Sequence, residues 1–124
     1  MKKQRPVNLD LRTIKLPITA YVSVLHRISG IILFFALAVM LYGLDKSLSS
    51  AQGFSEMQQC LSSPLAKGVV WVILSALLYH LLAGIRHLLM DMGVGETLQG
   101  GKQGSQWVLV VAVVVILLLG VWIW

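Results

Sequence analysis

Residues 80–91, His-Leu-Leu-Ala-Gly-Ile-Arg-His-Leu-Leu-Met-Asp, place two histidines and an arginine in an otherwise apolar stretch. Ionisable side chains are costly in hydrocarbon, so each is a candidate functional group. A neutral imidazole in dry surroundings is a common ligand of haem iron. His80, Gly84 and His87 recur at helical spacing on one face, and Gly84 would let a flat macrocycle or another helix approach closely. In the alternative, His80 hydrogen-bonds across a helix interface and Gly84 serves ordinary small-residue packing.

A second polar group lies in residues 23–30 and contains Ser23, His26 and Arg27. Ser23 and Arg27 are four residues apart and are therefore neighbours on one helix face. Their hydroxyl and guanidinium groups can donate hydrogen bonds to a carbonyl of a small ligand, and a guanidinium also pairs with carboxylates. In the alternative, Arg27 is a snorkelling anchor at the membrane surface and Ser23 bonds to its own helix backbone.

The elements that carry these groups are expected to be membrane-spanning helices. Of the 124 residues, 57% are hydrophobic and only 12% are charged, which excludes an ordinary soluble domain. Apolar stretches over about residues 21–44, 65–90 and 107–124 are each long enough to cross a hydrocarbon core of roughly 30 Å. Since continuous apolar runs without alternation favour helices, we predict one all-α membrane domain, residues 1–124, within a multi-subunit helical bundle.

The position of the basic residues predicts the topology. Six of them lie at or before the start of the first span: Lys2, Lys3, Arg5, Arg12, Lys15 and Arg27. The positive-inside rule then puts the N-terminus and the loop after the second span in the cytoplasm, and the C-terminus on the outer side. Cys60 is the only cysteine and falls in the outer loop, residues 45–64, so an intrachain disulfide is excluded. This loop could hold a short interfacial helix, which the sequence does not decide.

The topology also predicts depths. His80 lies about ten residues before the cytoplasmic end of its span, which is about 15 Å and near the midplane. Four side chains are then expected to converge near the cytoplasmic face: His26, Arg27, Arg86 and His87. This layout suits haem b, with iron at His80 and propionates toward the cations. His26 and His87 are expected to be too shallow to bind the opposite face of the iron, so a second ligand would come from another chain.

Two segments resemble the signatures of a known family. Residues 5–7 (Arg-Pro-Val), Leu11 and residues 23–30 (Ser-Val-Leu-His-Arg-Ile-Ser-Gly) are similar to the N-terminal signature of the cytochrome b membrane-anchor subunit of succinate dehydrogenase, respiratory complex II. Residues 80–91 resemble the second signature, a His followed by Gly-Ile-Arg-His and ending in Met-Asp. The likeness covers essentially the whole chain, and residues 5–11 resemble the enterobacterial type.

The resemblance implies specific roles. His80 would be one axial ligand of haem b, and a second three-helix anchor subunit would supply the other. Ser23 and Arg27 would line the ubiquinone site at the junction with an iron–sulfur subunit. His26 and Arg27, with His87, would lie near the haem propionates. FAD and the iron–sulfur clusters would belong to partner subunits, the location would be a bacterial inner membrane with the C-terminus in the periplasm, and this chain alone would complete no reaction.

Two other functions remain to be weighed. A haem-free structural anchor of a related quinone-linked fumarate reductase would leave His80 as a packing residue. A small transporter or channel would need a carboxylate within the membrane or a polar pore face, and all five acidic residues fall outside the apolar cores. The acidic residues therefore count against transport.

Overall fold

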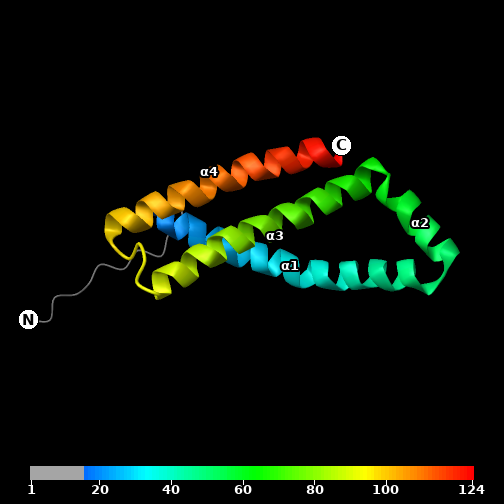
Figure 1. Cartoon of the computed structure of the whole chain (residues 1–124), viewed down its shortest axis with the longest axis horizontal. Coiled ribbons are helices and arrows are strands. Elements are labelled where there is room, and N and C mark those ends of the chain that lie inside the picture. The colour runs from blue at the N-terminus through cyan, green and yellow to red at the C-terminus, as the bar shows by residue number, and fades with distance from the viewer. Residues whose placement is uncertain (1–15) are drawn as a thin grey trace, which may run out of the picture.

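The computed structural model describes residues 16–124 and is built from four helices (Figure 1). They are α1 (Ile18–Ser49), α2 (Ala51–Leu61), α3 (Pro64–Asp91) and α4 (Leu98–Ile123). Helices α1, α3 and α4 are long and apolar enough to cross a membrane, which confirms the predicted all-α fold with three spans. The start of the N-terminal signature and five of the six basic residues of that region lie outside the described residues.

The three long helices form one bundle in which α3 packs against both α1 and α4. Figure 1 shows α3 running antiparallel to its two neighbours. The start of α1, the end of α3 and the start of α4 lie together at one end of the bundle, and α2 lies at the other. This is the alternation that three successive crossings of a membrane require.

Small side chains form most of the centre of the bundle. The buried cluster consists of Val22, Tyr79, Ala83, Val108 and Ala112. Alanines and glycines let helix backbones approach closely, which is the usual way that helices associate in lipid. The Tyr79 hydroxyl is buried there and donates a hydrogen bond of 2.9 Å to the Val22 carbonyl, so one polar tip ties α3 to α1.

The large apolar side chains mostly point away from this core. On α1, for example, Phe34 is 74% exposed and Phe35 is 68% exposed. A bundle with small residues inside and large ones outside presents a surface suited to lipid or to other membrane helices.

Helix boundaries differ from the expected spans because the helices extend beyond their apolar cores. α4 begins at Leu98 rather than near 107, and the Thr97 side chain caps it by accepting a hydrogen bond from the Gly100 amide at 2.9 Å. The glycine-rich connection between the second and third spans, expected over residues 91–106, therefore shrinks to residues 92–97. In it, Gly93 and Gly95 have φ angles of +87° and +71°, which favour glycine.

The outer loop contains a helix that the sequence left undecided. Ser50 separates α1 from α2 and caps α2 by accepting from the Gly53 amide at 2.8 Å. A side chain at Gly53 would collide with the Lys46 carbonyl, so glycine permits this close turn. An ion pair of 3.1 Å between Lys46 and Glu56 also joins α2 to α1.

Candidate functional site

The His80 ring of α3 is held against α1 through one of its two nitrogens. Its Nδ1 lies 3.0 Å from Ser29 Oγ and 3.2 Å from the His26 carbonyl oxygen. The Ser29 hydroxyl donates its own hydrogen to that carbonyl at 2.6 Å, so both neighbours of Nδ1 act as acceptors. In a neutral ring the proton then resides on Nδ1, and the lone pair of Nε2 is left for a ligand. We assign the tautomer on this network.

This arrangement is the one that metal-binding histidines usually adopt. A ligating imidazole typically donates its other N–H to a carbonyl or another polar group, which fixes the ring orientation and raises the basicity of the ligating nitrogen. Ser29 is 4% exposed and was missed by the sequence reasoning, although it falls inside the first signature. The available signal was its spacing, since Ser29 comes one turn after His26 on the same helix.

His26 lies at the level of His80, which corrects the expectation that it is too shallow. The two rings are stacked, with centroids 4.1 Å apart and planes 14° from parallel. The reason is that α1 starts at Ile18, three residues before the predicted start of the span, so His26 lies deeper in the helix. His87 also approaches His26, with ring centroids 5.2 Å apart, so the predicted convergence of these two histidines is confirmed.

The stacking gives a different reason why His26 would not be the opposite ligand of an iron bound by His80. Axial imidazoles point ring nitrogens at the metal from opposite sides, with metal–nitrogen bonds of about 2 Å. Here the two rings face each other with their flat sides at 4.1 Å, and no macrocycle fits between them. The Nε2 atom of His26 is buried and has no hydrogen-bond partner, so this nitrogen remains available to another group.

Two glycines make the histidine contacts possible. A Cβ at Gly30 of α1 would lie 3.2 Å from His80 Cε1, and a Cβ at Gly84 of α3 would lie 3.5 Å from His26 Nε2. Each helix thus offers a glycine to the histidine of the other. Gly84 was expected to allow close approach of either a flat macrocycle or another helix, and the structure shows the close approach of helix α1.

Arg86 does not join the histidines, and the expectation that it converges with His26, Arg27 and His87 is wrong. Its guanidinium is buried against α4 and donates a hydrogen bond of 3.1 Å from Nη2 to the Gly101 carbonyl. Successive residues of an α-helix are about 100° apart around its axis. Since His87 faces α1, its neighbour Arg86 must point elsewhere.

Ser23 and Arg27 lie one turn apart near the start of α1, with Arg27 exposed and Ser23 half-buried. Within residues 16–124, no hydrogen bond or ion pair connects them to each other or to the histidines. Both side chains therefore have donors that no group in residues 16–124 uses. A pocket that uses them needs walls that residues 16–124 do not provide.

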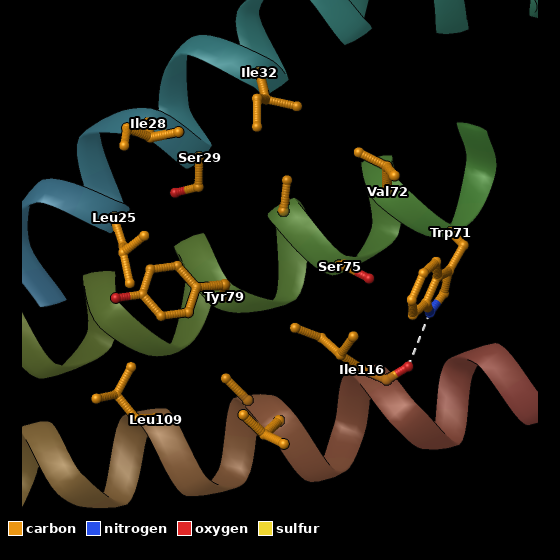
Figure 2. A pocket seen from close by; sticks show the side chains of 13 residues that line it. Leu25, Ile28, Ser29, Ile32, Trp71, Val72, Ser75, Tyr79, Leu109 and Ile116 are labelled. Carbon is orange, nitrogen blue, oxygen red and sulfur yellow. Dashed lines mark hydrogen bonds between the residues drawn. The ribbon is translucent and has the colours of Figure 1, made fainter. Parts of the chain in front are cut away.

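A separate apolar pocket of about 420 Å³ lies between the three long helices (Figure 2). Figure 2 shows Leu25 and Ser29 from α1 facing Tyr79 of α3, with Ile116 of α4 accepting a hydrogen bond from the Trp71 indole. The lining contains neither Ser23 nor Arg27 and no charged side chain. The pocket can hold hydrocarbon, but it offers no cation for a quinone oxygen.

Comparison with known proteins agrees with the signatures. The family model of the succinate dehydrogenase/fumarate reductase transmembrane subunit matches residues 1–119. The chain is 45% identical over 125 residues to the succinate dehydrogenase cytochrome b556 subunit of Coxiella burnetii, covering all of both chains. It is 31% identical over 102 residues to the subunit of the same name from Paracoccus denitrificans, covering 82% of this chain and 78% of that one.

A eukaryotic protein is also similar. The mitochondrial inner membrane protein SHH3 of Saccharomyces cerevisiae is 32% identical over 112 residues, which cover 84% of this chain and 57% of that protein. Because the family model spans nearly the whole chain, this chain belongs to the family of succinate dehydrogenase and fumarate reductase transmembrane subunits, which confirms the resemblance.

Proposed function

We propose that this chain is the membrane-anchoring, haem b-binding subunit of a succinate dehydrogenase and contributes to electron transfer from succinate to ubiquinone. The observation that carries the proposal is the fixed His80 ring, whose Nδ1 is engaged by Ser29 and the His26 carbonyl. Membership of the family and the names of the similar proteins support the same function.

The residues present fit a haem. His80 would bind the iron through Nε2, and the haem would supply one-electron redox chemistry there. The orphaned Nε2 of His26 suits a propionate oxygen, because a buried ring nitrogen needs a polar partner. His87, whose ring lies 5.2 Å from that of His26, would supply a further donor for an anionic group there. The exposed guanidinium of Arg27, one residue after His26, would reach a propionate only from a different face of α1.

The second axial ligand would come from a second small anchor subunit. The stacking of His26 on His80 leaves no imidazole of residues 16–124 on the opposite side of such an iron. The ring contacts of the three histidines involve only α1 and α3, so the face that they occupy is left uncovered by α4. A helix of another subunit bearing a histidine would complete the site.

Ser23 and Arg27 would form one wall of the ubiquinone site, next to the iron–sulfur subunit. Donors fixed in advance near a quinone oxygen stabilise the negative charge that develops as electrons arrive. Arg27 is exposed and Ser23 is half-buried near the start of α1, where a water-soluble subunit could cover them. FAD and the iron–sulfur clusters would belong to the partner subunits.

The proposed setting is a bacterial inner membrane, with residues 1–124 forming one domain. The N-terminus would be cytoplasmic and the C-terminus periplasmic. The excess of basic residues at the N-terminal end supports this orientation.

A reduced-minus-oxidised spectrum of the purified complex tests haem binding. We expect a b-type band in the wild type that is lost in His80→Ala and retained in Tyr79→Phe, a matched change at the neighbouring residue, which faces the core instead. Absence of the band in the wild type would favour the haem-free anchor of a fumarate reductase. Survival of the band in His80→Ala would show that His80 is not the haem ligand. The stacked histidine pair is the observation that gives this alternative its support.

Separate activity assays test the quinone role. Arg27→Leu should lower succinate:quinone reductase activity while succinate oxidation with a soluble dye acceptor stays intact. Ser23→Ala should be milder, because one neutral hydrogen bond contributes about 0.5–1.5 kcal/mol. Equal loss of both activities in Arg27→Leu would indicate an assembly defect and remove the support for a quinone role.

A further inference from the structure

Arg86 is a buried cation on the side of α3 away from the histidines. Arg86 is only 8% exposed. Within residues 16–124 its side chain makes one hydrogen bond, from Nη2 to the Gly101 carbonyl. The Nε atom is fully buried and has no hydrogen-bond partner. Glycines on α4 make room for the group, since a Cβ at Gly104 would lie 3.3 Å from Arg86 Nε.

This guanidinium lacks an anion among the described residues. Within residues 16–124, the ion pair between Lys46 and Glu56 at the other end of the bundle is the only one. The carbonyl of Gly101 is neutral and is shared with the Ser105 hydroxyl, which donates to it at 2.9 Å. Burying a charge is unfavourable unless an opposite charge or several hydrogen bonds compensate it, so an anion is expected beside Arg86.

A pocket of about 300 Å³ adjoins Arg86 and has two chemically distinct parts. One part is backbone at Gly95 and Gly100, next to the first turn of α4. The other part is apolar and is formed by these side chains: Leu82, Ile85, Leu89, Met90, Val94 and Val108. The Gly100 amide is already bonded to the Thr97 side chain, so the Arg86 guanidinium is the group that favours an anion, while the apolar part favours hydrocarbon.

The depth of the pocket agrees with this division. Its lining residues belong to the end of α3, the connection and the start of α4, and these segments lie at one end of the bundle (Figure 1). The first turns of α4 are polar, and the apolar run starts only at Trp107, which is 70% exposed. Exposed tryptophans mark the boundary between headgroups and acyl chains, so the pocket spans this boundary.

We propose that this pocket is a binding site for a membrane phospholipid, with its phosphate at the Arg86 guanidinium and the start of an acyl chain along Leu89 and its apolar neighbours. A phosphate accepts charge-assisted hydrogen bonds from a guanidinium in a bidentate manner. The site is independent of haem, because Arg86 faces α4 whereas His80 and His87, the histidines of α3, face α1.

Native mass spectrometry of the whole membrane complex, released into detergent, tests the site. The wild type should retain one tightly held phospholipid that Arg86→Gln loses or binds at least about tenfold more weakly. Lys102→Gln is the matched control, because Lys102 is an exposed cation on the same turn of α4, and it should retain the lipid. The b-type spectrum should be unchanged in both variants.

Leu89→Trp provides a second variant in case Arg86→Gln fails to assemble. Leu89 is 43% exposed and lines the apolar part of the pocket, so the larger ring should displace the acyl chain and keep the charge. The proposal is overturned if assembled Arg86→Gln or Leu89→Trp retains as much phospholipid as the wild type. It is also overturned if Lys102→Gln loses as much phospholipid as Arg86→Gln. After the wild-type complex has been stripped of lipid, phosphatidylglycerol micelles should restore its heat stability. If inorganic phosphate protects the complex equally well, the site binds an anion without recognising lipid, and the proposal is rejected.

Discussion

Gly30→Ala should disturb the His80 ring, whereas Gly84→Ala should not. The two glycines play the same part on facing helices, but their spacing differs. A Cβ at Gly30 would lie 3.2 Å from His80 Cε1 and 3.6 Å from Nδ1, while a Cβ at Gly84 would lie 3.5 Å from His26 Nε2. Favourable contacts between heavy atoms begin at about 3.5 Å, so only the first substitution forces a movement, of about 0.3 Å.

The direction of that movement determines its effect. The ring must move away from α1, the helix that holds its Nδ1. Hydrogen bonds now 3.0 Å from Ser29 Oγ and 3.2 Å from the His26 carbonyl would lengthen toward or past the usual limit of about 3.2 Å. Overpacking typically costs about 1–3 kcal/mol, and replacing a helical glycine by alanine returns about 1 kcal/mol. The net loss is about 0–2 kcal/mol for Gly30→Ala, whereas Gly84→Ala should be neutral or slightly stabilising.

The assay is the b-type difference spectrum per mole of purified complex, followed during thermal unfolding. Gly30→Ala should lower haem content or melt at a lower temperature, and Gly84→Ala should match the wild type. The reasoning is refuted if Gly30→Ala is indistinguishable from the wild type, or if Gly84→Ala loses as much haem as Gly30→Ala.

Two further predictions concern contacts away from the histidines. Tyr79→Phe removes the buried hydrogen bond to the Val22 carbonyl and should lower the free energy of unfolding by about 0.5–1.5 kcal/mol, measurable by unfolding in mixed detergent; no loss would show that the bond contributes nothing net. Hydrogen bonds from the Lys46 ammonium and the Gln52 amide hold the pKa of Glu56 below its ordinary value of 4.5. Because the folded-state pKa is lowered, the ionised Glu56 stabilises the α1–α2 corner above pH 4.5. This stabilisation is lost as the pH falls through the lowered pKa and the carboxylate is protonated. In carboxyl NMR of the Glu-labelled chain, Lys46→Gln should return the Glu56 pKa toward 4.5, and an unchanged pKa would exclude the ion pair.

The three spans could be predicted from the sequence because crossing a membrane leaves a strong compositional signal. Apolar length sets the number of helices almost by itself. The same signal says little about helix ends, since polar turns such as residues 98–106 extend a helix beyond the hydrocarbon core. Capping by Thr97 determines the start of α4, and a cap is a weak signal within a glycine-rich segment.

The residue types of the candidate site could be predicted from the sequence, but the depth and the helix face of each side chain could be predicted less well. Both signatures put histidines on the right helices, and the pairing of His26 with His87 followed from antiparallel neighbours. Depth counted from expected span ends failed for His26, because an error of three residues moves a side chain by about 4.5 Å along a helix. Arg86 was misplaced for a rotational reason, since it was grouped with His87 by position and not by helix face.

Arg86 and His87 lie on different faces of α3, one toward α4 and the other toward α1. On one side, Tyr79 and Ala83 of α3 pack in the buried cluster with Val108 and Ala112 of α4. On the other side, His80 is oriented by Ser29, and within residues 16–124 the ring contacts of the histidines involve α1 and α3 but not α4. A histidine whose Nε2 lone pair has no partner is costly in a membrane unless a ligand binds that nitrogen. We therefore propose that the α1–α3 face is one half of a haem site that a second membrane subunit completes.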